Sequence, residues 1–241
     1  MASATLWGAI AASSLVIGAA LGLVRKWPDR QLGLVLSFGA GALISAVSFE
    51  LWEEGFRVGG AGWVGVGLAF GALSYFLASR RLDGDDPAEC GNHRPPSGSG
   101  GRALALGATL DGIPEQLVLG IGLASGKGIS ISLLLAIFIS NLPEAIGSAT
   151  DMSASGKPKR KILWLWVAVA GLVTLATMAG YALADVTGRS FSGAIDGFAA
   201  GALLVMLIDS MIPEARTKAG RVAGLASVLG FAVAAGLSSF S

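Results

Sequence analysis

Eight long apolar segments dominate this sequence, and most of its charged residues lie between them. The segments cover approximately residues 4–24, 32–52, 58–78, 103–124, 129–149, 162–185, 191–212 and 222–240. About 20 apolar residues in a helix cross the hydrocarbon core of a bilayer. Backbone polar groups must be satisfied internally in lipid, which such long segments achieve as helices. We therefore expect an all-α membrane protein with eight transmembrane helices in a single domain over residues 1–241.

The composition agrees with this class. Hydrophobic residues make up 53% of the chain and charged residues only 14%. The 36 glycines suit helices whose backbones approach closely, as they do in membrane bundles. A net charge of +1 provides no strongly basic surface for a nucleic acid. We therefore expect membrane lipid and small ions as partners, and no nucleic acid.

The positive charges predict how the segments are oriented. The stretches after the first, third, fifth and seventh segments hold 14 of the 17 lysines and arginines. Short loops rich in these residues stay in the cytoplasm. We therefore expect a multi-pass protein of the plasma membrane, with a cytoplasmic loop over residues 79–102 and both termini on the extracytoplasmic side.

Two segments carry a proline and acidic residues near the middle of the membrane. One contains Asp111-Gly-Ile-Pro-Glu115 and the other contains Ser140-Asn-Leu-Pro-Glu144. A charge at this depth is costly unless it is paired or hydrated, so such residues are functional candidates. A proline inside a helix also frees the carbonyl group one turn before it. Both features favour a cation site over a plain packing surface.

The spacing places the polar groups of each motif on one side of its helix. Asp111 and Glu115 are one turn apart, as are Ser140 and Glu144, and Asn141 lies beside the second pair. Carboxylate, amide and hydroxyl oxygens suit hard divalent cations, and zinc also accepts carboxylates. Neighbouring acids cannot all stay ionised without a cation, so a metal or protons must be present. We expect these five residues to bind a metal.

Other acids are candidates for the path of the cation. Asp209 lies toward the cytoplasmic side of the segment 191–212, and Glu214 follows at the end of that segment. We expect Asp209 to contact the metal on its way out of the site. Glu50, near the outer end of the segment 32–52, fits either recruitment of cations or an ordinary solvated helix end.

A weak internal repeat relates the two halves of the chain. Phe38-Gly-Ala-Gly-Ala-Leu43 resembles Phe198-Ala-Ala-Gly-Ala-Leu203, which lies 160 residues later. The two stretches cross the membrane in opposite directions under the expected topology. Similar sequence in opposite orientation is typical of inverted-repeat transporters, whose substrate site lies between the repeats. The repeat would relate segments 1–3 to segments 6–8, with the two proline-containing segments between them.

These features resemble the ZIP (Zrt/Irt-like) family of divalent-metal transporters, of which the chain looks like a divergent bacterial-type member. The family has eight helices in a 3+2+3 arrangement and a metal centre between helices 4 and 5. Its helix 4 typically reads His-Asn-x-Pro-Glu-Gly, and its helix 5 reads His-Glu-x-Pro-His-Glu or Gln-Asp-x-Pro-Glu-Gly. The corresponding stretches here are Asp111-Gly-Ile-Pro-Glu-Gln116 and Ser140-Asn-Leu-Pro-Glu-Ala145. The family pattern Leu-x-Pro-Glu-Ala, which ends helices 2 and 7, corresponds to Leu51-Trp-Glu-Glu-Gly55 and Met211-Ile-Pro-Glu-Ala215.

The resemblance implies a transporter, not an enzyme, that moves a divalent metal into the cytoplasm. It implies Asp111, Glu115 and Glu144 as metal ligands, with Asn141 and Ser140 supporting them. The motif histidines of the family are absent, so one metal site is expected in place of two. An all-oxygen site also relaxes the preference for zinc. The metal (Zn, Mn, Fe, Mg or Cd) is then a substrate and not a cofactor. The sequence is also compatible with a homodimer.

Two other functions remain compatible with the residues. An intramembrane hydrolase would use Asp111 and Asp209 as an aspartyl dyad, although the chain has no Gly-x-Gly-Asp motif. A proton-coupled carrier of an organic solute would use the same acids as proton relays. The sequence has no Gly-x₄-Gly-Lys-Ser/Thr loop for ATP phosphates. The expected driving force is therefore an ion gradient together with the membrane potential.

Overall fold

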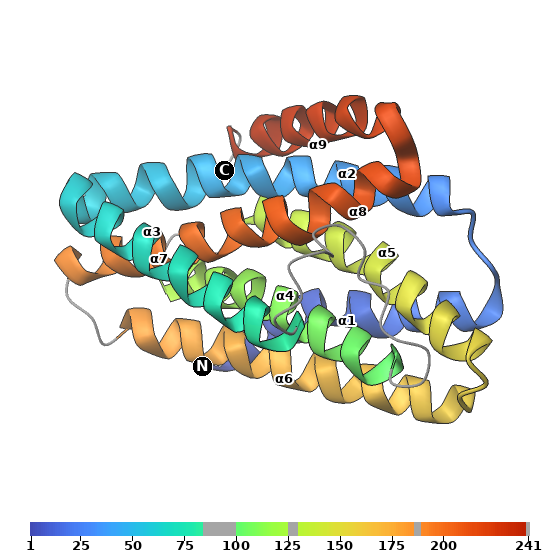
Figure 1. Cartoon of the computed structure of the whole chain (residues 1–241). Helices are drawn as coiled ribbons and strands as arrows, with labels where there is room; N and C mark the ends of the chain where they lie inside the picture. The colour runs from blue at the N-terminus through green and yellow to red at the C-terminus, as the bar shows by residue number, and fades with distance from the viewer. Residues whose placement is uncertain (84–99, 125–129, 186–188, 240–241) are drawn as a thin grey trace.

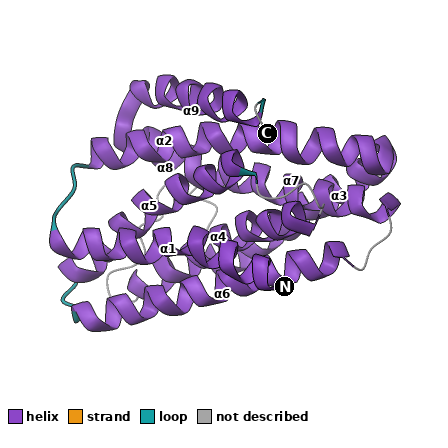
Figure 2. Ribbon diagram, turned by 180° about the vertical axis from the view of Figure 1, so that it is seen from behind, coloured by secondary structure: helices purple, strands orange, loops and turns teal. Residues whose placement is uncertain are grey.

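The computed structural model describes residues 1–83, 100–124, 130–185 and 189–239. Within these ranges all regular structure is helical and no strand occurs (Figure 2). The α-helices are α1 (Ala2–Val24), α2 (Asp29–Ala46), α3 (Glu53–Asp83), α4 (Gly100–Ala124), α5 (Ile131–Ala154), α6 (Lys159–Asp185), α7 (Arg189–Met206), α8 (Ile212–Ala219) and α9 (Ala223–Ser238). Two π-helical segments, η1 (Val47–Trp52) and η2 (Leu207–Met211), join α2 to α3 and α7 to α8, and a short 3₁₀ helix, η3 (Gly220–Val222), precedes α9.

Five helical runs in the described residues are long and apolar enough to cross a membrane. They are Ala2–Val24, Asp29–Arg81, Ile131–Ala154, Lys159–Ala184 and Gly193–Ser238. This confirms the expected all-helical class and membrane-spanning character in the part of the chain that the structure describes. The second and fifth runs have 53 and 46 residues, far more than a single crossing needs. The second run contains the expected segments 32–52 and 58–78, and the fifth covers most of the segments 191–212 and 222–240.

A glycine turns the chain within the second of these runs. Gly60 lies inside α3 with φ +77° and ψ 163°, so the helix is broken there. A positive φ is readily adopted only by glycine. The segment 58–78, expected as a helix of its own, accordingly begins at this break.

Helical structure extends into both ends of the stretch 79–102, which was expected to be a loop. The helix α3 continues to Asp83, and α4 already begins at Gly100. Residues 84–99, which include Cys90 and His93, lie outside the described residues.

Glycines bring two pairs of helices into backbone contact along the bundle in Figure 1. The helix α2 packs against α9, where a Cβ added at Gly41 would lie 1.8 Å from the carbonyl oxygen of Ser227. The helix α3 packs against α7, where a Cβ at Gly71 would lie 1.9 Å from the carbonyl oxygen of Phe198. No side chain fits at such distances. Small residues therefore let these helices approach closely, as the glycine content predicts.

The remaining helices pack in the same manner around the two that contain prolines. The helix α1 contacts α5, and a Cβ at Gly22 would lie 2.5 Å from the carbonyl oxygen of Ile146. The helix α4 contacts α6, and a Cβ at Gly120 would lie 2.0 Å from the carbonyl oxygen of Thr177. Both α4 and α5 are thus held from the side by an outer helix.

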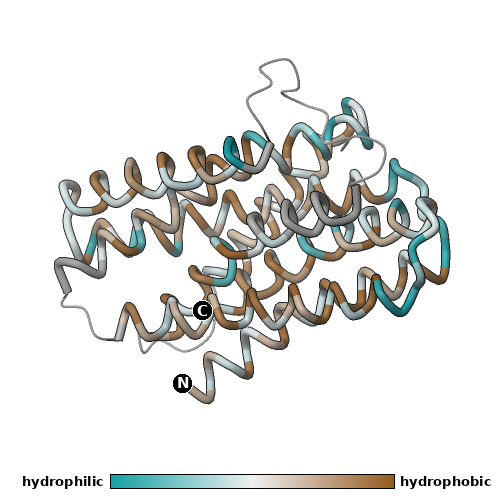
Figure 3. The backbone as a smooth tube through the Cα atoms, turned by 60° about the horizontal axis from the view of Figure 1, so that its bottom comes forward, coloured by the Kyte–Doolittle hydropathy of each residue, from teal (hydrophilic) through white to brown (hydrophobic). Residues whose placement is uncertain are grey.

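One end of the bundle carries several of the basic stretches. The ends of α1, α5 and α8 meet the beginnings of α2 and α6 there, at the right of Figure 1. The ammonium group of Lys159 donates a hydrogen bond of 3.1 Å to the carbonyl oxygen of Leu23. Backbone coloured by hydropathy is largely apolar along the helices and hydrophilic at this end (Figure 3). The structure thus brings the basic residues of 25–30, 157–161 and 216–221 to one side.

Candidate functional site

A buried hydrogen bond links the two helices that contain prolines. The hydroxyl of Ser140 on α5 lies 3.1 Å from a carboxylate oxygen of Glu115 on α4, and it also lies 2.9 Å from the carbonyl oxygen of Ile137. The two polar residues are only 1% and 2% exposed. A hydroxyl carries one hydrogen, so these acceptors compete for the same donor. In the bundle interior, the hydroxyl of Ser140 therefore donates its hydrogen either to the carboxylate of Glu115 or to the carbonyl oxygen of Ile137.

The helix α2 closes the site on the Ser140 side. A Cβ added at Gly39 would lie 2.8 Å from the Cα atom of Ser140. The backbones of α2 and α5 therefore touch where the motif begins. The neighbouring Asn141 is 1% exposed, and its side-chain nitrogen has no hydrogen-bond partner among the residues that the structure describes.

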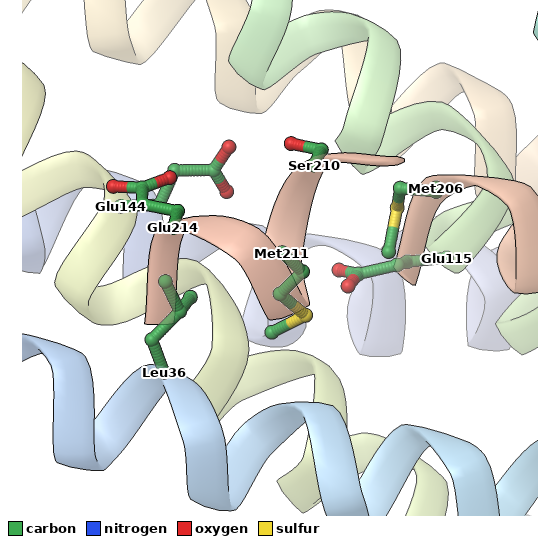
Figure 4. A pocket seen from close by; sticks show the side chains of 7 residues that line it. All are labelled: Leu36, Glu115, Glu144, Met206, Ser210, Met211 and Glu214. Carbon is green, nitrogen blue, oxygen red and sulfur yellow. The ribbon is translucent and has the colours of Figure 1, made fainter. Parts of the chain in front are cut away.

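A small pocket runs from Glu115 to the first turn of α8. Its lining residues come from α2, α4, α5, α7, η2 and α8 and are Leu36, Glu115, Glu144, Met206, Ser210, Met211 and Glu214. Glu144 and Glu214 lie next to each other at one end of the pocket, and Glu115 lies beside Met206 toward the other (Figure 4). About 10 Å³ of the pocket is open to the centre of a water-sized sphere. This is roughly the room of one water molecule.

A lysine contacts the acid at the α8 end of the pocket. The ammonium nitrogen of Lys218 lies 2.6 Å from a carboxylate oxygen of Glu214, and both side chains are half-buried. The same nitrogen would lie 3.3 Å from a Cβ added at Gly147, which is one turn beyond Glu144 on α5. A positive charge thus lies between α8 and α5 where the pocket ends.

The two π-helical segments place polar groups against α4 and α5. Ser210 in η2 lines the pocket beside Glu115 and Glu144. Glu50 in η1 accepts a hydrogen bond from the hydroxyl of Ser132, near the start of α5. The π-helix adds one residue to a helical turn and is frequently found at functional sites.

The structure brings together most of the residues that the sequence predicts for the site. Glu115 and Ser140 are buried and joined by a hydrogen bond, Asn141 beside Ser140 is also buried, and Glu144 lines the pocket. Asp111 belongs to α4, but its side chain lies outside the described residues. Among the side chains that are described, no group of three or more His, Cys, Asp or Glu is close enough to hold one metal ion.

Asp209 does not line this pocket. Its side chain is exposed, whereas the next residue, Ser210, lines the pocket. Both belong to η2, where the π-helical turn shifts the face that each residue presents relative to an α-helix.

Five further residues of the site were missed from the sequence. Leu36, Met206, Ser210 and Met211 line the pocket, and Lys218 contacts Glu214. The spacing of Glu214 and Lys218 at i and i+4 is an ordinary helical ion pair and could have indicated the contact. The other four are apolar or uncharged residues of apolar segments and carry no comparable signal.

Comparison with known proteins gives homologues over most of the chain. No family model matches it. A protein of Arabidopsis thaliana named "Putative zinc transporter" is 30% identical over 206 residues, which are 81% of this chain but only 32% of that protein. The zinc transporter ZupT of Enterobacter sp. (strain 638) is 26% identical over 217 residues, 86% of this chain and 84% of that protein. ZupT of Escherichia coli O7:K1 is 27% identical over 217 residues, which are again 86% of this chain and 84% of that protein. The chain thus spans about a third of the plant relative's length.

Proposed function

We propose that the chain is a ZIP-family transporter, as its similarity to proteins named zinc transporters supports, and that it carries divalent metal cations across a membrane. The single observation that carries this function is the convergence of Glu115, Glu144 and Glu214 on one pocket inside a bundle of apolar helices. Carboxylates inside a membrane protein are costly and mark the paths of cations.

The pocket supports a stepwise path for the ion. Glu115 and Ser140 form the deeper station, to which Asn141 adds an amide and Asp111 a further carboxylate by its place in the motif. Glu144 and Glu214 form a second station at the first turn of α8. An ion that moves from the first pair to the second keeps carboxylate oxygens around it at each step.

The lining atoms suit several metals. Carboxylate and hydroxyl oxygens favour Mg²⁺ and Mn²⁺, and the thioethers of Met206 and Met211 add softer donors to the lining. The relatives are named zinc transporters, and we propose zinc as a transported ion of this protein. We also propose manganese, iron or cadmium as transported ions. The ion is a substrate that passes through the site and not a cofactor.

An inverted repeat accounts for the way in which the helices pack. Val47 and Leu207, which begin η1 and η2, are 160 residues apart, the offset of the sequence repeat. The contact of Gly71 with Phe198 has a counterpart in that of Gly230 with Phe38, where a Cβ would lie 2.0 Å from the carbonyl oxygen. The second phenylalanine is again 160 residues before the first. These paired contacts support a 3+2+3 arrangement of eight spans, in which α4 and α5 lie between the repeats.

The orientation follows from the basic end of the bundle. We place that end in the cytoplasm and both termini outside, in the plasma membrane. The Glu214 end of the pocket then faces the cytoplasm. Inward movement of a divalent ion is favoured by about 4.6 kcal/mol for each 100 mV of membrane potential.

The aspartyl-dyad alternative requires Asp209 to face the interior. The side chain of Asp209 is exposed instead, next to Ser210, which does line the pocket. Transport by a carboxylate path therefore explains more of the geometry than hydrolysis does.

The direct test is metal flux into proteoliposomes that contain the purified protein. Zn²⁺, Mn²⁺, Fe²⁺, Mg²⁺ and Cd²⁺ are offered separately, with a metal-sensitive dye inside the vesicles and an imposed inside-negative potential. We expect saturable uptake of at least one transition metal, with empty liposomes as the control. Equal dye responses in empty and protein-containing vesicles for all five ions would contradict the proposal.

A further inference from the structure

A second, larger cavity lies between α2, α8 and α9. It is separate from the pocket lined by Glu115, Glu144 and Glu214, which we call the carboxylate pocket. The second cavity has a volume of about 320 Å³, and its lining includes Ser37, Ile212, Arg216, Arg221 and Ser227. None of these residues lines the carboxylate pocket. The volume is that of a small ligand site.

The cavity follows from how the chain turns between α8 and α9. Gly220 ends α8 with φ +66°, and η3 then leads into α9. The helix α9 is held against α2 at Gly41 and Ser227, and α8 is held against α2 at Gly33, where a Cβ would lie 2.7 Å from the backbone nitrogen of Ala219. Four residues that line the space between these two contacts, Ala215, Gly220, Ala223 and Gly224, are too small to fill it.

Two guanidinium groups line this space. Arg216 and Arg221 are exposed, and neither forms an ion pair with a residue that the structure describes. The acid nearest to them in sequence, Glu214, is bound by Lys218. Guanidinium groups bind phosphate oxygens with paired, charge-assisted hydrogen bonds. The cavity thus offers the chemistry of a phosphate site at the basic end of the bundle.

The surface next to the arginines is apolar and faces outward. Ile212 in the lining is 38% exposed, and on the following segment Leu225 and Val228 are 73% and 67% exposed. In a chain that spans a membrane, such side chains contact acyl chains. A ligand that satisfies both features has a phosphate head and an apolar tail.

We propose that the cavity between α2, α8 and α9 binds the headgroup of an anionic phospholipid, with its phosphate on Arg216 and Arg221. Basic pockets between transmembrane helices on the cytoplasmic side are suited to such headgroups. The helix that carries Arg216 also carries Glu214 and Lys218, so the lipid contacts the element that forms the inner end of the ion path. Binding of the lipid does not depend on the proposed transport function.

The test measures lipid binding by the purified full-length chain in neutral detergent. Native mass spectrometry and thermal unfolding are followed while phosphatidylglycerol, phosphatidylcholine or inorganic phosphate is added. We expect phosphatidylglycerol to be retained and to raise the unfolding temperature more than the other two. Equal stabilisation by inorganic phosphate would assign the cavity to a free anion, and equal retention of phosphatidylcholine would show that charge is not recognised. Either result would overturn the proposal.

Two variants and a matched control locate the binding. The double variant Arg216→Gln and Arg221→Gln should weaken phosphatidylglycerol binding about tenfold. The control double variant, Lys26→Gln and Arg30→Gln, loses the same amount of charge from exposed residues at the same end of the bundle. It should bind phosphatidylglycerol as the wild type does. A Cβ at Gly224 meets no atom within 4 Å, so Gly224→Leu fills the cavity and should also weaken binding with both arginines intact. Equal losses in the cavity double variant and the control, or full binding by Gly224→Leu, would contradict the assignment.

Discussion

The ammonium nitrogen of Lys218 and a carboxylate oxygen of Glu214 lie 2.6 Å apart at the α8 end of the carboxylate pocket. Under the proposed function, a metal ion that leaves through this end would have to displace or pass this positive charge. We expect the lysine to compete with the ion for Glu214 and to weaken binding of the ion there. Release and selectivity at the inner end would then depend on this balance.

The first prediction concerns this pair. Lys218→Gln should lower the KM for metal uptake and reduce the maximal rate by about fivefold, the equivalent of roughly 1 kcal/mol at a partly exposed ion pair. Removal of the competing charge leaves Glu214 free to hold the ion. The measurement is initial uptake into proteoliposomes over a range of metal concentrations. Asp29→Asn, at an exposed position of the same end, serves as the control. Unchanged KM and rate in Lys218→Gln would show that the pair is a plain helical ion pair.

A second prediction concerns Glu144. Glu144→Ala should abolish metal uptake although the protein still reaches the membrane, because the ion loses a carboxylate between Glu115 and Glu214. Surface expression is checked by membrane fractionation and folding by size-exclusion chromatography. A transport rate close to that of the wild type would remove Glu144 from the path.

The third prediction tests the contact of α2 with the site. Gly39→Ala places a Cβ 2.8 Å from the backbone of Ser140 and should lower the stability by about 1–3 kcal/mol. Gly62→Ala is the matched control, since a Cβ there meets no atom within 4 Å. Thermal unfolding of both variants in the same detergent provides the comparison. Equal unfolding temperatures would mean that α2 and α5 are farther apart than the structure shows.

The fourth prediction concerns metal preference at the deeper station. Asp111→His supplies a nitrogen ligand and should raise the ratio of Zn²⁺ to Mn²⁺ affinity. The change is made alone, because a Cβ at the adjacent Gly112 would already lie 3.0 Å from a methyl group of Val173. Calorimetric titration with the two metals gives the ratio. A ratio that stays constant or falls would indicate that Asp111 does not face the ion.

The fifth prediction tests the topology. Cys90 is the single cysteine of the chain and belongs to the stretch of sequence between α3 and α4. A membrane-impermeant maleimide added to intact cells should leave it unmodified, because the basic residues of that stretch predict a cytoplasmic position. The same reagent should modify it after the cells are permeabilised. Labelling in intact cells would reverse the proposed orientation.

Much of the site was predictable because membrane depth makes polar residues conspicuous. Glu115, Ser140, Asn141 and Glu144 were found from their positions in apolar segments, and the structure buries three of them and places the fourth in the pocket. The rule behind this is energetic, since polar groups at such depth need a partner or a function.

The part that was not predictable depends on local backbone geometry. Asp209 was predicted to face the path, but the π-helical turn of η2 presents Ser210 instead. The extra residue in such a turn leaves no signature in composition or spacing. The break at Gly60 was equally hidden, because a glycine with positive φ cannot be told apart from the many glycines that serve close packing.

The backbone contact of α3 with α7 joins parts of the chain that are synthesised far apart in time. The glycine face of α3, at Gly67 and Gly71, is covered by α7, which follows α4, α5 and α6 in the chain. The contact of α2 with α9 involves an even later helix. These close glycine contacts of α2 and α3 therefore form only after most of the chain has been synthesised. A chain that stops before α9 would keep the contact of Gly39 with Ser140 but would leave the α2 surface at Gly41 uncovered.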